Sequence, residues 1–158
     1  MAGRRRSSWR DDGGFIGGIE VLPFGILVFV VGILLVANAW AVIDARLAAG
    51  SAAREAARTY VETVTGDDSR GATQAAGEAA RAAFLGHGRD PEAMGFVIDP
   101  PGAVARCQPI HVTVSYEIRA VTIPFIGGLG SMSVAATHTE IIDPFRNDVA
   151  TSGAAPCA

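Results

Sequence analysis

The chain has 158 residues, of which 49% are hydrophobic and 18% are charged. This balance excludes a disordered polar tail, and two cysteines are too few to staple a small disulfide-rich fold. The net charge is −3 and every basic residue is arginine, so no basic surface for nucleic acid is expected. Aromatic residues make up only 7% while alanine and glycine are abundant, which argues against a bulky core around a deep catalytic pocket.

A basic leader opens the chain. Arg4, Arg5, Arg6 and Arg10 precede the first apolar stretch, and Arg46 is the first positive residue after it. Because short arginine-rich segments stay on the cytoplasmic side, we expect the N-terminus in the cytoplasm and the remainder outside the cytoplasmic membrane.

Residues 24–43 form an apolar stretch in which Asn38 is the only strongly polar side chain. A helix of this length spans about 30 Å, which is one bilayer crossing. Pro23 suits a first helical turn, and Trp40 and Asp44 suit the far headgroup layer and the water beyond it. The sequence therefore predicts one membrane-spanning helix.

A secretory signal peptide is the alternative for this stretch. Residues 37–39 and 39–41 have the small side chains of cleavage sites, and a cut there would release a secreted binding domain. However, the apolar stretch is longer than a typical signal, and Asp11, Asp12 and Glu20 precede it. A retained helix is favoured.

Strong helix formers continue to about Val64, so we expect the membrane helix to extend outward. Arg58 and Glu62 are spaced to pair along it. A stripe of small residues follows one face, for which packing within its own domain is favoured over packing on a neighbouring subunit. The stripe consists of Ala53, Ala57, Val61 and Val64.

A second, alanine-rich helix is predicted from a cap at Asp68 or Ser69 to about Leu85. With little apolar area to bury, it must pack closely or remain marginal. Residues 95–99, 110–121 and 132–142 read as strands, and apolar residues alternate in the second of them. The alternating residues are Ile110, Val112, Val114, Tyr116 and Ile118. We expect an α+β fold with a three-stranded antiparallel sheet, one face of which the outer helix covers.

The loop of residues 122–130 is apolar where loops are usually polar. Its candidate contact residues are Pro124, Phe125, Ile126 and Leu129. The membrane surface, a partner chain and the chain's own helix are all candidates for what it touches, with its own helix favoured.

Cys107, His111, His138 and Cys157 lack the paired spacing of metal ligands, so no metal site is expected. A disulfide between Cys107 and Cys157 is predicted instead; it would contribute about 3–4 kcal/mol in the chain-entropy model. Two free thiols are the alternative.

No nucleophile motif, phosphate loop or spaced pair of carboxylates is present. The glycines of residues 127–130 lack the Lys and Ser/Thr of a phosphate loop. We therefore expect no catalytic residue and no cofactor, and a protein that is not an enzyme.

The segment before the membrane helix resembles the class III signal of type IV pilins and pilin-like proteins: a basic leader ending in Gly, then a hydrophobic residue, then a Glu. The resemblance implies that a prepilin peptidase cuts between Gly14 and Phe15, and that Glu20 neutralises an N-terminal amine during assembly. Glu20 would be the sixth mature residue rather than the family's fifth; a start at Ile16 would restore the family's register.

Four short segments follow in order further along the chain: residues 53–58, residues 112–116, Pro124 with the glycines at 127 and 128, and residues 134–137. Together they resemble the TadE family of the tight-adherence (Flp) pilus apparatus, over about residues 14–146. The resemblance implies a single-pass, pilin-like minor subunit of the cell envelope, a pseudopilin in its general organisation.

These expectations divide the chain into a cytoplasmic leader with a possible prepilin-peptidase site (1–20), a transmembrane helix (21–45) and an extracytoplasmic α+β domain (46–158). The expected function is non-enzymatic, in assembly of a tight-adherence pilus or a related secretion machine. The expected partners are the cytoplasmic membrane, other pilin-like subunits or pilus assembly proteins, and prepilin peptidase. The alternative is a single-pass envelope protein whose outer domain binds a wall component or another membrane protein without entering a pilus.

Overall fold

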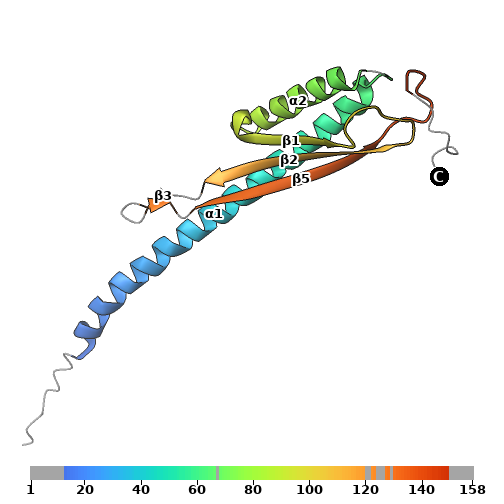
Figure 1. The fold of residues 1–158 in the computed structure, drawn as a ribbon. Helices are drawn as coiled ribbons and strands as arrows, with labels where there is room; N and C mark the ends of the chain where they lie inside the picture. The colour runs from blue at the N-terminus through green and yellow to red at the C-terminus, as the bar shows by residue number, and fades with distance from the viewer. Residues whose placement is uncertain (1–12, 67, 120–121, 124–126, 129, 150–158) are drawn as a thin grey trace, which may run out of the picture. The chain divides into compact units, whose positions relative to one another are not determined.

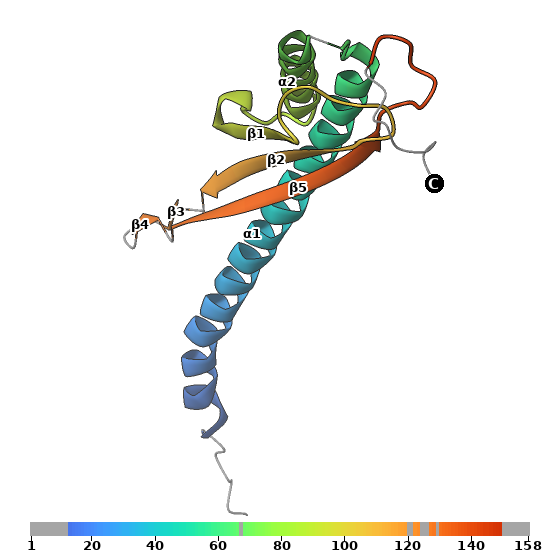
Figure 2. The same cartoon turned by 45° about the vertical axis from the view of Figure 1, so that its right-hand side comes forward.

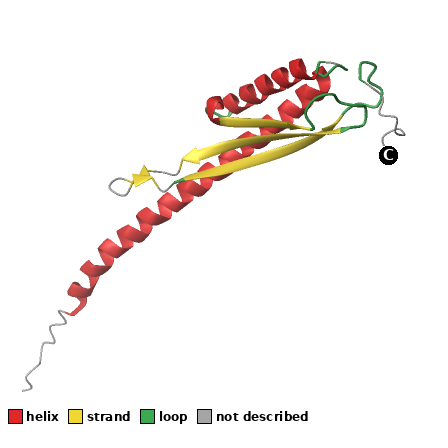
Figure 3. Cartoon of the chain, viewed as in Figure 1, coloured by secondary structure: helices red, strands yellow, loops and turns green. Residues whose placement is uncertain are grey.

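The computed structural model describes residues 13–66, 68–119, 122–123, 127–128 and 130–149 (Figure 1). The chain divides into two compact units, Met1–Ala37 and Asn38–Ala158, and we call the second the head. The elements in order are α1 (Gly13–Thr63), α2 (Ser69–Gly86), the 3₁₀ helix η1 (Pro91–Ala93), β1 (Met94–Asp99), β2 (Pro109–Arg119), β3 (Thr122–Ile123), β4 (Gly127–Gly128) and β5 (Ser131–Ile141) (Figure 3). The predicted α+β fold, with a long apolar helix, a second helix and a three-stranded antiparallel sheet, is confirmed.

α1 begins earlier than the sequence predicted. Pro23 lies inside the helix, ten residues after Gly13, and not in its first turn. A proline inside a helix removes one backbone hydrogen bond, which apolar membrane helices tolerate better than helices in water. From there α1 runs without a break to Thr63, as the alanine-rich sequence favours.

α2 has the predicted boundaries, and of the two candidate caps the structure selects Asp68. The Asp68 carboxylate accepts a hydrogen bond from the Gly71 N–H at 2.8 Å. α2 buries every fourth residue, namely Ala72, Ala76, Ala80 and Phe84. Because three of these four are alanines, the helix can approach its neighbours closely, which answers the expectation that it must do so.

The sheet has the order β1-β2-β5, and both pairings are antiparallel. Val114 is opposite Phe96 on one side and Ala136 on the other. The alternation predicted for β2 is confirmed, since Ile110, Val112 and Val114 are fully buried. A separate two-stranded ladder joins β3 to β4, within residues 122–130, which the sequence analysis predicted to be a loop.

The core of the head lies between the sheet, α2 and an alanine face of α1. Figure 2 shows β1, β2 and β5 crossing one side of the C-terminal part of α1, with α2 beside it. The alanines on this face have no exposed surface: Ala45, Ala48, Ala49, Ala52, Ala53, Ala56 and Ala57. Tyr60 and Phe84 supply the largest buried side chains. The small-residue stripe of α1 therefore packs within its own domain, as predicted, and it is wider than the sequence suggested.

Candidate functional site

α1 contains the one stretch in the described part of the chain that is long and apolar enough to cross a membrane, within Val21–Thr63. The mean hydropathy of its most apolar window is 2.7, and none of that window is buried. Phe24, Phe29 and Leu35 each expose 67% of their surface. An apolar surface of this extent is unfavourable in water, so the helix is consistent with membrane anchoring.

Within the head, α1 has two unlike faces. The alanine face is buried, while Trp40, Ile43 and Leu47 expose 70%, 53% and 60% of their surfaces. Their spacing of three and then four residues places them on one side of the helix. Further along that side, Arg54 and Arg58 are exposed. We call this side, from Trp40 to Arg58, the exposed face of α1.

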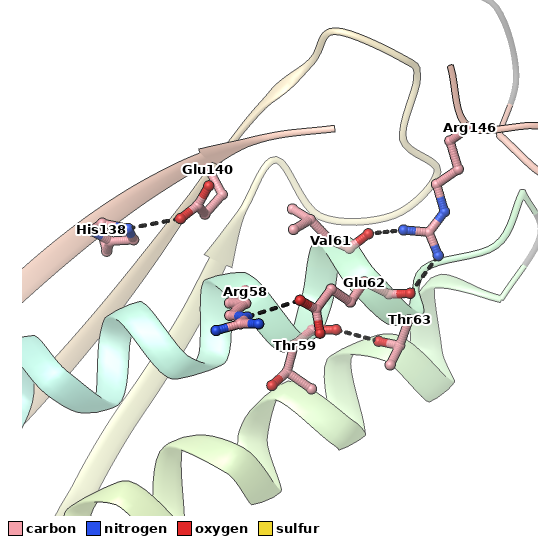
Figure 4. Close-up of polar contacts among 8 residues, drawn as sticks. All are labelled: Arg58, Thr59, Val61, Glu62, Thr63, His138, Glu140 and Arg146. Carbon is pink, nitrogen blue, oxygen red and sulfur yellow. Dashed lines mark hydrogen bonds and ion pairs between the residues drawn. The ribbon is translucent and has the colours of Figure 1, made fainter. Parts of the chain in front are cut away.

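A charged pair lies on the last turns of α1 (Figure 4). Arg58 Nε donates to Glu62 Oε1 at 2.8 Å, which confirms the predicted pairing. The two side chains are 69% and 59% exposed, so solvent screens the attraction and it adds little to stability. The pair is available to charged groups outside the chain.

The same turns of α1 also bind Arg146, in the segment that follows β5. The Arg146 guanidinium donates to the Val61 carbonyl and, at 2.6 Å, to the Glu62 carbonyl (Figure 4). The last carbonyls of a helix lack intrahelical partners, and a cation there also complements the helix dipole. The segment after β5 therefore caps α1.

A second fastening lies where the apolar stretch of α1 ends. Arg89 Nη2 donates to Asp44 Oδ2 and, at 3.4 Å, to the Ala41 carbonyl. The guanidinium carbon lies 5.9 Å from the centre of the Tyr116 ring. By accepting the hydrogen bond, Asp44 raises the pKa of Arg89 above its ordinary value. Arg89 thus ties α1 to β2 and to the residues that follow α2.

The predicted cleavage and assembly residues, Gly14, Phe15 and Glu20, all fall within α1. Gly14 and Phe15 belong to its first turn, which is the part of a helix that frays most readily. Cleavage between them and the role of Glu20 stay predictions.

Cys107 adopts a left-handed backbone conformation with φ of 66° just before β2. Its N–H donates to the Ile142 carbonyl at 3.0 Å, and none of the described cysteines is a free thiol. Cys157 lies outside the described residues, so its pairing with Cys107 stays a prediction. Of the predicted contact loop, Pro124, Phe125, Ile126 and Leu129 also lie outside the described residues.

The histidines do not converge. His111 is opposite Thr139 in the β2–β5 register, whereas His138 is opposite Val112, so strand alternation places the two rings on opposite faces of the sheet. His111 Nδ1 contacts Thr139 Oγ1 at 2.8 Å, and His138 Nε2 contacts Glu140 Oε1 at 3.1 Å. Among the described residues, no group of three potential ligands is placed to hold a metal ion.

A hollow of about 520 Å³ lies between α1 and α2, with Ser51, Glu55 and His87 among its lining residues. Ser51 Oγ contacts His87 Nε2 at 2.8 Å and donates its proton to the Ala48 carbonyl at 2.9 Å. The contact joins the two helices.

A second hollow, of about 470 Å³, lies on the face of the sheet away from the helices and is lined in part by Ser115, Glu117, Ser131 and Ser133. Gly95 also lines it, and a Cβ at that position would come within 2.3 Å of Ser115 Oγ. A larger residue at this position would require the Ser115 hydroxyl to rotate away. The hollow is rich in hydroxyl groups.

The sequence did not predict the contacts of Arg89 with Asp44 or of Arg146 with Val61, because 45 residues separate the first pair and 85 separate the second. The only signal at Asp44 was its position next to the apolar stretch, which does not indicate its partner.

Comparison with protein-family models, with curated proteins and with solved structures found no match to this chain.

Proposed function

We propose that this chain is a non-enzymatic, membrane-anchored, pilin-like protein that acts in assembly of a tight-adherence pilus or a related secretion machine. The observation that supports the proposal is that different parts of α1 have different surroundings. The helix holds the sheet and α2 with its alanine face, while its apolar stretch and its exposed face remain available to a membrane and to other helices.

The exposed face offers both apolar and charged side chains for the proposed packing. Trp40, Ile43 and Leu47 offer apolar area where the helix leaves the membrane, and Arg58 with Glu62 offers charges of both signs further out. A neighbouring helix that packs in the same orientation would bury the first group and exchange partners with the second. Glu20 would neutralise the amine of a neighbouring subunit, as the resemblance implies.

A charge placed on the exposed face tests this packing. Leu47→Arg should abolish co-purification with other pilin-like subunits from detergent-solubilised membranes, because it puts a desolvated cation into the helix contact. Leu85→Arg is the matched control, since Leu85 is 58% exposed on α2 against 60% for Leu47. Equal recovery of partners with both variants would contradict the proposal.

Glu20→Arg provides a second, independent test of the same assembly. We expect it to abolish the co-purification while the chain still fractionates with membranes, since the apolar stretch is unchanged. Unaltered recovery of subunits with Glu20→Arg would remove the assembly role of the carboxylate.

A second candidate function is favoured by the hydroxyl-rich face of the sheet. Thr113 and Thr137 are hydrogen-bonded at 2.8 Å, and the serine-lined hollow lies on the same face. Such a surface suits a polyhydroxylated wall component. Retention of the full chain on isolated cell-wall glycan, lost in Gly95→Leu, would support this function; absence of retention would reject it.

A further inference from the structure

The two helices of the head border a hollow. Figures 1 and 2 both show α2 beside the last turns of α1, and the hollow between the two helices has a volume of about 520 Å³. The residues of α2 that line it all have small side chains: Ala79, Ala82, Ala83 and Gly86. Because no large side chain stands on this wall, a further helix can approach α2 closely there.

The α1 wall of the same hollow is polar. Ser51 and Glu55 line it from successive turns, and Ser51 Oγ contacts His87 Nε2 at 2.8 Å. Glu55 is the one carboxylate among the described residues that line the hollow, and none of these is an arginine. Within the part of the chain that the structure describes, Glu55 forms no ion pair. The hollow therefore presents an alanine wall beside an unpaired carboxylate.

A cation of matching character lies on the exposed face of α1. Arg54 is exposed, and its Nε donates to the Gly50 carbonyl at 3.2 Å. Like Glu55, it forms no ion pair with any described residue. Leu47, two helical turns earlier on the same side, is 60% exposed. The exposed face thus offers an apolar side chain and a cation to a surface that carries alanines and a carboxylate.

Arg54 and Glu55 do not pair with each other within one chain. Successive residues of an α-helix point about 100° apart, so neighbouring side chains face different directions. In two copies that cross a membrane in the same orientation, the Arg54 side of one helix can face the Glu55 side of the next. A contact between two different surfaces of the same molecule is heterologous, and it can repeat from copy to copy.

We propose that the hollow between α1 and α2 is the docking site for the exposed face of α1 from a second copy of this chain. Leu47 of the incoming copy packs on the alanine wall, and Arg54 of that copy pairs with Glu55. The inference rests on the membrane anchoring and helix packing in the proposed function, and it names the surface that receives the neighbouring helix. Each copy gives one such contact and receives another, so the subunits form an open row.

A charge swap in the full-length chain tests this docking. Two copies with different affinity tags are expressed together in native membranes, and recovery of the second copy with the first is measured after detergent extraction. Arg54→Glu or Glu55→Arg, present in both copies, should lower this recovery roughly tenfold, because like charges then meet in the contact. The chain that carries both changes should recover its second copy to within about twofold of the original, because opposite charges meet again.

Matched variants on α2 separate the hollow from the rest of the surface. Glu78→Arg is the charge control, since Glu78 is exposed and does not line the hollow, and it should leave recovery unchanged. Ala82→Trp fills the hollow without altering charge and should also lower recovery, whereas Leu85→Trp, outside the lining, should not. Near-ultraviolet circular dichroism checks that each variant keeps the fold.

The outcomes distinguish this docking from the proposed function. A doubly swapped chain that recovers no better than the single variants would overturn the docking, as would an original chain that recovers no second copy. Equal recovery with Ala82→Trp and Leu85→Trp would overturn it as well. If Leu47→Arg abolishes recovery of other pilin-like subunits while the charge swap has no effect, the docking in the hollow is wrong and the proposed function stands.

Discussion

The two faces of α1 in the head differ in side-chain size and in burial. The alanine face buries many small side chains, so the sheet and α2 come close to the helix axis and the contact is held by shape. The opposite face carries Trp40, Ile43 and Leu47, whose large side chains are more than half exposed. The difference shows that one face stabilises the head, while the other is the face through which we propose that neighbouring subunits pack.

Truncating a large side chain on the buried face should have the largest effect. Tyr60 is 1% exposed, so Tyr60→Ala should lower the free energy of unfolding of the head by about 3–5 kcal/mol through the cavity it leaves. Leu47→Ala on the exposed face should change it by less than about 0.5 kcal/mol. Denaturant unfolding in detergent, followed by near-ultraviolet circular dichroism, measures both. Similar losses would erase the distinction between the faces.

Enlarging an alanine should come next. Ala56 has no exposed surface, and Ala56→Leu should cost about 1–3 kcal/mol because the sheet and α2 must move apart. Arg54→Leu, two residues away on the exposed face, is the matched control and should unfold like the original chain. An unchanged midpoint for Ala56→Leu would show that the close packing does not determine stability.

The Asp44–Arg89 ion pair should contribute less to the free energy of unfolding, because both partners retain contact with water. A double-mutant cycle of Asp44→Ala and Arg89→Ala should give a coupling of about 1 kcal/mol after allowance for solvent screening. Hydrogen exchange of the Tyr116 amide should increase in both single variants, since Arg89 joins β2 to α1. Additive single effects would mean that the two residues act independently.

The smallest effect is expected on the exposed face. Arg58→Ala removes an ion pair whose side chains are 69% and 59% exposed, and it should leave the unfolding midpoint unchanged. The same change should weaken co-purification with other subunits, because the exposed face is proposed to meet a neighbour. A loss of stability without a loss of partners would reverse the assignment of this face.

Local patterns were sufficient for most of the fold. The alternation in β2 predicted which residues face the core, and the spacing of Arg58 and Glu62 predicted their contact. The start of α1 was not predictable, because a proline usually marks a first turn and Pro23 lies well inside the helix. The β3–β4 ladder was missed since glycines at 127 and 128 have low strand propensity.

The candidate site was predictable only where its signal was local. The apolar stretch and the small-residue stripe of α1 follow from composition and spacing. Arg89 and Arg146 could not be assigned partners, because their contacts depend on how the chain folds back on α1. Nor does a sequence pattern separate an exposed leucine at position 47 from a buried one, since that depends on which side of α1 receives the sheet.

The mature N-terminus is the most direct test of the account. Intact-mass measurement and N-terminal sequencing of the chain from membrane fractions should give a start at Phe15, or at Ile16 if the register of Glu20 determines the cut. Either result retains the apolar stretch and fits a processed pilin-like protein. A start at Trp40 or Val42 would mean that the stretch is removed as a signal, which would contradict both the anchoring and the packing through α1.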